Sequence, residues 1–209
     1  MPGKTAAQIK RQKEKDRKKK QRETEAIKQE HERGHDKAAE RESELKVVLA
    51  LLEKIQRKMI DVPADGNCLF HALVQQHGEV QLTKLSAEAL RATVGEYLLS
   101  HREKFAPFWT PEAGDSDDEE ETWESRCARV KSDSSLWGST LEVAAAADLF
   151  RVRIGLLGEA GVQIFGPDSP DGNTNSFDWC IVHLKHMYVL GEHFNGTVSL
   201  TPSGAASSK

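Results

Sequence analysis

The feature that most limits the possible folds is a change in composition near residue 45. Residues 1–45 are dominated by charged residues, Gln and Ala, and contain 14 Lys or Arg against 10 Asp or Glu. Such a segment has too few apolar side chains to build a core, so we expect a solvated helix or a disordered arm. Its basic excess lies within residues 1–22. The remaining length, roughly 160 residues, suits one domain.

An apolar stripe follows the charged arm. Its members recur at spacings of three and four residues: Leu45, Val48, Leu52, Ile55 and Met59. This spacing predicts an amphipathic helix over 46–58. The apolar face either packs on its own domain, which we favour, or forms a short coiled coil with a partner.

Beyond this helix, the pattern predicts helices first and strands later. Helices are expected over 69–76, over 86–100 and from the capping-box pair Ser139 and Glu142 to about residue 149. Short apolar or alternating runs predict strands at 152–157, 162–165, 179–184 and 197–200. This order favours an α+β fold with a small, mostly antiparallel sheet flanked by helices. We therefore expect a folded domain over 59–201 and a disordered tail over 202–209.

Several classes of protein are not expected. No run approaches the roughly 20 apolar residues of a membrane span, and the charged N-terminus does not resemble a secretory signal. The three cysteines, Cys68, Cys127 and Cys180, are too few and too scattered for a disulfide scaffold or a zinc site. We therefore expect a reducing compartment, the cytoplasm and also the nucleus, and no membrane partner.

Cys68 is a candidate nucleophile. Pro63 and the pair Asp65-Gly66 indicate a turn, so Cys68 should stand at or just before the start of a helix. The positive end of a helix dipole favours a thiolate, and the free backbone N–H groups there can receive an oxyanion. A cysteine at the start of a buried helix is, however, more often a core residue, so this position alone does not decide between the two roles.

His193 and Asn195 change that balance. They lie about 125 residues downstream of Cys68 and lead into a predicted strand. Residues i and i+2 of a strand point to the same face, so the amide of Asn195 can orient the imidazole of His193. Cysteine hydrolases need such a base and such an orienting group, and papain-like proteases use the chain order Cys, His, Asn.

Three segments resemble the ovarian-tumour (OTU) family of deubiquitinating cysteine proteases. Residues 65–72 resemble its nucleophile motif, residues 191–195 its histidine motif, and residues 136–142 its Trp-Gly-Gly-x-x-Glu helix start. They occur in the family's order and spacing across roughly residues 58–200. The resemblance implies an OTU-like papain-type fold. A basic, coiled-coil-like arm before such a domain resembles one OTU subgroup.

The resemblance also implies roles for individual residues. Cys68 is similar to the family's nucleophile, His193 to its general base, and Asn195 to the residue that orients that base. Asp65 matches a motif aspartate that is counted with the family's active site. The oxyanion hole would consist of the backbone N–H groups of Asp65, Gly66, Asn67 and Cys68. Trp137 and Glu142 resemble scaffold residues beneath the site.

The implied reaction is hydrolysis of the isopeptide bond between a ubiquitin C-terminus and a lysine, without metal or cofactor. The implied partners are ubiquitin or polyubiquitin and ubiquitinated proteins. Two other interpretations stay open. One is a cysteine hydrolase of another ubiquitin-like modifier. The other is a catalytically silent ubiquitin-binding module or adaptor, with residues 1–45 binding RNA, the ribosome or another acidic partner.

Overall fold

The computed structural model of the chain describes residues 37–80, 85–110, 121–169, 172–188 and 191–200. The chain divides into two compact units, Met1–Ser43 and Glu44–Lys209. Of the predicted arm, residues 37–45 are helical; residues 1–36 and the predicted tail over 202–209 lie outside the described residues. No helix in the described ranges is both long enough and apolar enough to cross a membrane.

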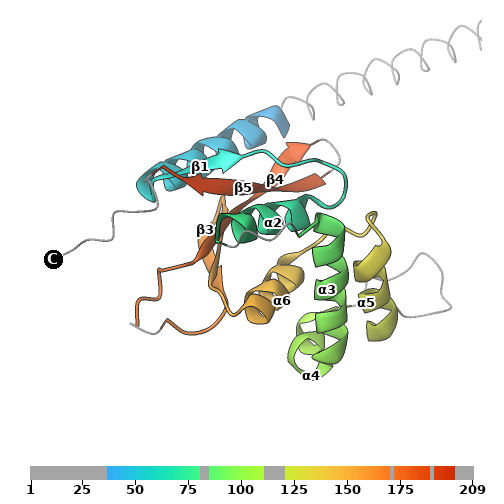
Figure 1. The fold of residues 1–209 in the computed structure, drawn as a ribbon. Coiled ribbons are helices and arrows are strands. Elements are labelled where there is room, and N and C mark those ends of the chain that lie inside the picture. The colour runs from blue at the N-terminus through green and yellow to red at the C-terminus, as the bar shows by residue number, and fades with distance from the viewer. Residues whose placement is uncertain (1–36, 81–84, 111–120, 170–171, 189–190, 201–209) are drawn as a thin grey trace, which may run out of the picture. The chain divides into compact units, whose positions relative to one another are not determined.

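A five-stranded sheet forms the centre of the second unit (Figure 1). Its strands are β1 (Arg57–Ile60), β2 (Ile154–Gly158), β3 (Gly161–Phe165), β4 (Trp179–Tyr188) and β5 (Gly191–Ser199). They lie in the order β1-β5-β4-β2-β3. The pair β2–β4 is parallel, and the other three described pairs are antiparallel. The predicted α+β class with a mostly antiparallel sheet is therefore confirmed.

Helices cover one face of this sheet (Figure 1). They are α2 (Cys68–Val80), α3 (Ala87–Ser100), α5 (Trp123–Ser132) and α6 (Thr140–Phe150), with two short helices, α4 (Arg102–Phe105) and η1 (Ala106–Phe108). The three predicted helices are present. The start of α6 is the predicted capping box, in which the Ser139 hydroxyl accepts from the Leu141 N–H and the Glu142 carboxylate accepts from the Ser139 N–H.

The apolar run of β4 alternates between two cores. Trp179 and Ile181 face the core beneath α2, α3, α5 and α6. Cys180 and Val182 face a second core, which helical residues 44–54 cover. Burial on both faces explains why this strand reads as continuously apolar. Cys180, together with Cys127 in α5, is fully buried.

The predicted amphipathic helix over 46–58 is displaced. The helix runs from 37 to 54, and residues 57–60 form β1 instead. Gln56 adopts a φ of 53°, a left-handed conformation that ends the helical path. The stripe nevertheless packs on its own domain, because Val48 and Leu52 are buried against the sheet. Strand β1 thus begins two residues before the predicted boundary at residue 59, because apolar spacing alone does not show that Met59 belongs to a strand.

Glu44 attaches the first helix to an irregular part of β4. Its carboxylate is 1% exposed and accepts hydrogen bonds from the backbone N–H groups of Lys185 at 2.6 Å and His186 at 3.0 Å. These donors lie where the β4–β5 register shifts, between Leu184 and Tyr188. A buried side chain therefore provides hydrogen-bond acceptors at an irregular part of the strand.

We expect Glu44→Ala to lower the free energy of unfolding by about 2–4 kcal/mol, because it removes a buried carboxylate that accepts two backbone hydrogen bonds. Urea titration monitored by tryptophan fluorescence measures this. Glu53→Ala, an exposed position on the same helix, is the matched control and should change the value by less than about 0.5 kcal/mol. Equal losses in the two variants would contradict this role for Glu44.

Candidate active site

The loop before α2 is shaped by glycine and by a carboxylate. Gly66 adopts a φ of +82°, and a Cβ atom there would collide with the Ser134 carbonyl oxygen. The Asp65 carboxylate accepts the Asn67 N–H at 2.9 Å and contacts the His71 Nε2 at 2.9 Å. Asp65 thus closes an Asx-type turn. Of the four amides predicted for the oxyanion hole, that of Asn67 is already engaged by Asp65 in this conformation.

Cys68 is the first residue of α2, as the turn chemistry predicted. Its side chain is 8% exposed. Burial raises the pKa of the Cys68 thiol, although hydrogen bonds from the backbone N–H groups of Phe194, Leu69 and Cys68 itself oppose that shift. The backbone N–H groups at the helix terminus thus act in the expected direction, toward the thiolate. The cost of burying the charge exceeds the benefit from the amides.

His193 and Asn195 lie on the part of β5 that β1 leaves uncovered. The β1–β5 ladder ends at the pair Ile60↔Gly196, so residues 193–195 are buried and pair with β4 but not with β1. The backbone N–H of Phe194 on this stretch is among the groups that lower the pKa of the Cys68 thiol. The structure thus places the cysteine against the residue that lies between the histidine and the asparagine. These three predicted site residues come together in space from opposite ends of the domain.

The Asn195 amide has a fixed orientation. Its oxygen accepts from the Val62 N–H at 3.1 Å, and its nitrogen donates to Asp61 Oδ1 at 3.2 Å. The same oxygen lies 3.1 Å from His193 Nε2. An amide oxygen only accepts, so Nε2 must carry the proton. In a neutral ring, Nδ1 then keeps a lone pair that can take a proton.

Burial of His193 lowers the pKa of its imidazole, and the hydrogen bond to Asn195 and the charge of Asp61 only partly oppose this. The lowered pKa of His193 and the raised pKa of Cys68 both favour the neutral forms, a neutral imidazole and a neutral thiol. Such a pair differs from a preformed thiolate–imidazolium ion pair, because the proton still has to move during attack.

This resting state predicts the pH dependence of alkylation. A raised thiol pKa means that the thiolate fraction is small near neutrality and grows as the pH rises. We expect the rate of Cys68 alkylation by iodoacetamide to keep rising between about pH 7 and about pH 9, by tenfold or more. Mass spectrometry of the labelled cysteine measures it. A rate that is already level below about pH 7 would instead indicate an ion pair.

Sequence reasoning missed Asp61. The predicted site aspartate, Asp65, bonds within its own turn and to His71, whereas the carboxylate that contacts Asn195 belongs to Asp61. The available signal was its position directly after a strand. Only the pairing of β1 with β5 shows that this position lies opposite Asn195.

The middle motif supplies one wall of the site. Trp137 is 45% exposed, and its ring lies against the backbone of Gly191, where a Cβ atom would collide with it. The prediction that it is a scaffold residue beneath the site was therefore wrong. Glu142 does have a buried structural role, because it caps α6 and forms an ion pair with Arg126 at 2.9 Å.

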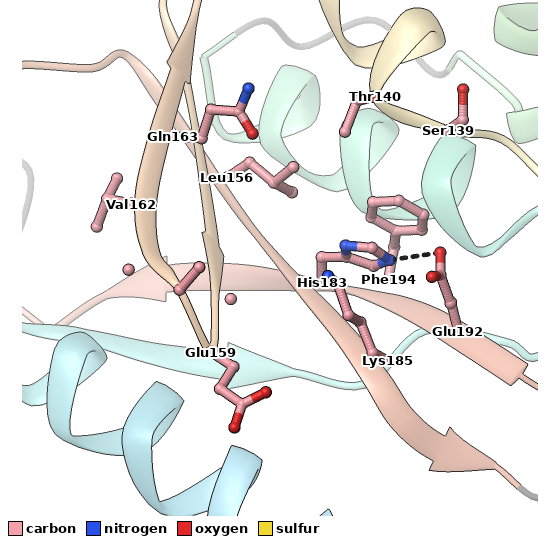
Figure 2. A pocket seen from close by; sticks show the side chains of 13 residues that line it. Ser139, Thr140, Leu156, Glu159, Val162, Gln163, His183, Lys185, Glu192 and Phe194 are labelled. Atoms are coloured by element: carbon pink, nitrogen blue, oxygen red, sulfur yellow. Dashed lines mark hydrogen bonds and ion pairs between the residues drawn. The ribbon is translucent and has the colours of Figure 1, made fainter. Parts of the chain in front are cut away.

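A pocket of about 380 Å³ lies on the other side of Phe194. Figure 2 shows the Phe194 and His183 rings on its wall, with Glu192 beside them; the rings stack with centroids 4.4 Å apart, and His183 Nε2 contacts Glu192 at 2.9 Å. The N-terminus of α6 and the β2–β3 hairpin complete the lining. Phe194 therefore both lines the pocket and lies next to Cys68. Within the described ranges, no three His, Cys, Asp or Glu side chains converge as a metal ion would require.

Comparisons with known proteins agree with this arrangement. A model of the family described as OTU-like cysteine protease matches residues 63–194. Ubiquitin thioesterase otu2 of Schizosaccharomyces pombe is 32% identical over 148 residues, which cover 69% of this chain and 46% of that protein. Human deubiquitinase OTUD6B is 30% identical over 165 residues, which cover 77% of this chain and 53% of that protein. The chain thus spans about half the length of these relatives.

Among solved structures, the OTU domain of OTUD1 superposes with a TM-score of 0.52 at 18% identity, covering 78% of this chain and 99% of that chain. This likeness concerns the fold alone. The fold and the family model therefore lead to the same group of proteins as the site geometry.

Proposed function

The chain belongs to the OTU-like cysteine protease family, and from that membership we propose that it is a deubiquitinase that hydrolyses isopeptide bonds at the ubiquitin C-terminus. The observation that carries the proposal is the hydrogen bond between His193 Nε2 and Asn195 Oδ1, on the strand whose Phe194 N–H acts on the Cys68 thiol. The names of the matched relatives, a ubiquitin thioesterase and a deubiquitinase, support ubiquitin as the substrate.

In the proposed mechanism, the Cys68 sulfur attacks the isopeptide carbonyl carbon while Nδ1 of His193 takes the thiol proton. The carbonyl electron pair moves to the oxygen, and backbone N–H groups at the start of α2 stabilise the oxyanion. The carbonyl then re-forms and expels the lysine amine, which receives the proton from His193. Water, deprotonated by His193, hydrolyses the thioester and releases ubiquitin with a free carboxylate.

The hydrogen bond from His193 Nε2 to Asn195 gives the imidazole its role as base. It fixes the tautomer before attack and stabilises the imidazolium that forms during attack. The proposed role of Asp61 is to hold the Asn195 amide so that its oxygen faces the ring. The proposed role of Asp65 is to shape the loop that presents Cys68.

The surroundings of the site support an extended peptide as the bound group. The half-exposed Trp137 packs against Gly191, and Glu192 and Phe194 line the pocket, so both features border the segment that starts β5. We propose that polyubiquitin and ubiquitinated proteins are the physiological substrates. The three cysteines are free and buried, which suits a reducing compartment, so we propose action in the cytoplasm or nucleus. The proposed RNA or ribosome contacts of residues 1–45 fall largely outside the described residues.

Cleavage of lysine-linked di-ubiquitin tests this function. We expect the full chain to release mono-ubiquitin from at least one linkage type, as followed by gel and intact mass, and the Cys68→Ala variant to release none. A matched set of substrates joined to other ubiquitin-like modifiers distinguishes the alternative hydrolase. Cleavage of those substrates without cleavage of any di-ubiquitin would overturn the proposal.

A further inference from the structure

Arg91 is the most extensively bonded side chain near the candidate site. It lies in α3 and is 3% exposed. Its guanidinium has five N–H donors, and it makes five hydrogen bonds. The acceptors are Asn67 Oδ1 at 2.7 Å and the carbonyl oxygens of Gly66 at 2.8 Å, Asp133 at 2.9 Å, Val130 at 3.1 Å and Leu136 at 3.1 Å.

None of these five acceptors is a carboxylate. Burial therefore lowers the pKa of Arg91, although nearby charges including Glu142 oppose this. Val130 lies in the last turn of α5, where carbonyl groups are left without helical partners and carry partial negative charge. The Phe70 ring adds a cation–π contact, with the guanidinium carbon 4.5 Å from its centroid. The donors of a guanidinium lie in a rigid, planar fork, so Arg91 is suited to fixing the positions of the neutral groups that it binds.

These contacts join two segments that meet at the candidate site. On one side, Arg91 holds the Gly66 carbonyl and the Asn67 side chain, which directly precede Cys68. On the other side, it holds the Leu136 carbonyl, next to Trp137, whose ring lies against Gly191. One side chain thus connects the nucleophile loop to the wall beside the start of β5.

The orientation of the loop peptides follows from these bonds. Because the Gly66 carbonyl points to Arg91, the Asn67 N–H of the same planar peptide points the opposite way, toward Asp65. The Asn67 carbonyl then accepts the first bond of α2, from the His71 N–H at 2.9 Å. The Cys68 N–H lies on the other side of that peptide and consequently points out of the N-terminal end of the helix. A rotated 66–67 peptide would break this alignment.

We propose that Arg91 is a positioning residue for the reaction: by holding Gly66 and Asn67 it keeps the backbone N–H groups at Cys68 aimed at the oxyanion. The proposal rests on the proposed thiol mechanism. It predicts that loss of the fork geometry slows only steps that form a tetrahedral oxyanion. Thiol reactivity in a displacement without an oxyanion should be preserved, because Arg91 does not contact the sulfur through any of its five bonds.

Two small reagents distinguish a loss of oxyanion stabilisation from a loss of thiol reactivity, and neither requires ubiquitin. p-Nitrophenyl acetate acylates the Cys68 thiolate through a tetrahedral oxyanion, forming the C–S bond and expelling p-nitrophenolate. Iodoacetamide alkylates the same thiolate by displacing iodide, with no oxyanion. The test measures the ratio of the two rates in wild type and Arg91→Lys, with Cys68→Ala subtracted as background. Arg91→Lys keeps the charge and loses the fork, so charge and geometry are distinguished.

Arg126→Lys is the matched control, because Arg126 is also a buried arginine but its ion pair is with Glu142 in the α6 cap. We expect the acylation-to-alkylation ratio to fall at least about tenfold in Arg91→Lys and to change less than about twofold in Arg126→Lys. Asn67→Ala removes one acceptor while leaving Arg91 intact, and it should lower the ratio in the same direction.

An unchanged ratio in both Arg91→Lys and Asn67→Ala would overturn the proposal, as would a parallel loss of both rates in folded protein. Thermal melts show whether a variant is folded. If Arg91→Lys does not fold, the acylation-to-alkylation ratio of Asn67→Ala decides whether the proposal holds. Failure of wild type to cleave di-ubiquitin would overturn the proposed function instead. That result leaves the reagent ratio measurable, so the two failures are distinguishable.

Discussion

Replacing Cys68 with alanine is expected to remove di-ubiquitin cleavage, lowering kcat by at least about 10⁴-fold. No other thiol can substitute for it, because Cys127 and Cys180 are fully buried in the cores. The effect should be on chemistry and not on binding. The variant should therefore keep its affinity for ubiquitin and its thermal midpoint to within a few degrees. Initial rates of mono-ubiquitin release, measured alongside a melting curve, test this.

Cys127→Ala is the matched control for the loss of a buried thiol. The pKa of Cys127 is raised by burial to about 11, so it carries no thiolate near neutrality. We expect a modest loss of stability and a kcat within about twofold of wild type. Residual cleavage by Cys68→Ala, or loss of cleavage in folded Cys127→Ala, would contradict the assignment of the nucleophile.

Asn195→Ala is expected to lower kcat/KM by about 10²–10³-fold, with little effect on the alkylation of Cys68 at high pH. The reason is the tautomer. Without the Asn195 oxygen, nothing in this contact holds the proton on Nε2 of His193, so Nδ1 is no longer reserved as the base. Steady-state rates across pH, together with alkylation rates, measure the two effects separately.

A paired substitution tests the geometry more sharply. Asn195→Asp alone places a carboxylate about 3 Å from Asp61, and like charges at that distance repel. The double variant D61N/N195D exchanges donor and acceptor, so the amide now donates to the carboxylate and the His193 contact is kept. We expect the double variant to be at least about tenfold more active than N195D. Equal activity of the two would contradict the Asp61–Asn195 contact as an orienting pair.

Local pattern predicted much of the fold. The capping box at Ser139 and Glu142 and the position of Cys68 at a helix start were correct because they depend on residues close in sequence. The end of the first helix was wrong, because the same apolar stripe continues from helix into β1. Helix α5 was missed because its sequence is strongly charged and follows an acidic run, so its buried residues give a weak signal.

In the candidate site too, residues whose role depends on near neighbours in sequence were predicted, and residues whose contacts are distant in sequence were missed. His193 and Asn195 were found because two residues on one strand share a face, which sequence shows directly. Asp61 and Arg91 were missed because their contacts are with segments about 130 residues and about 25 residues away, respectively. The backbone N–H groups at the helix start lower the pKa of the Cys68 thiol, as expected, but the larger and opposite effect of burial depends on the whole fold, which the sequence does not show.

The measurement that tests the central claim most directly is the reaction of the full chain with ubiquitin bearing a C-terminal electrophile, read as a change in intact mass. We predict one ubiquitin-sized adduct on wild type, located at Cys68 by peptide mapping, and none on Cys68→Ala. A chain that gives no adduct while iodoacetamide still labels Cys68 would contradict the claim, since the nucleophile would then be present and reactive without recognising ubiquitin.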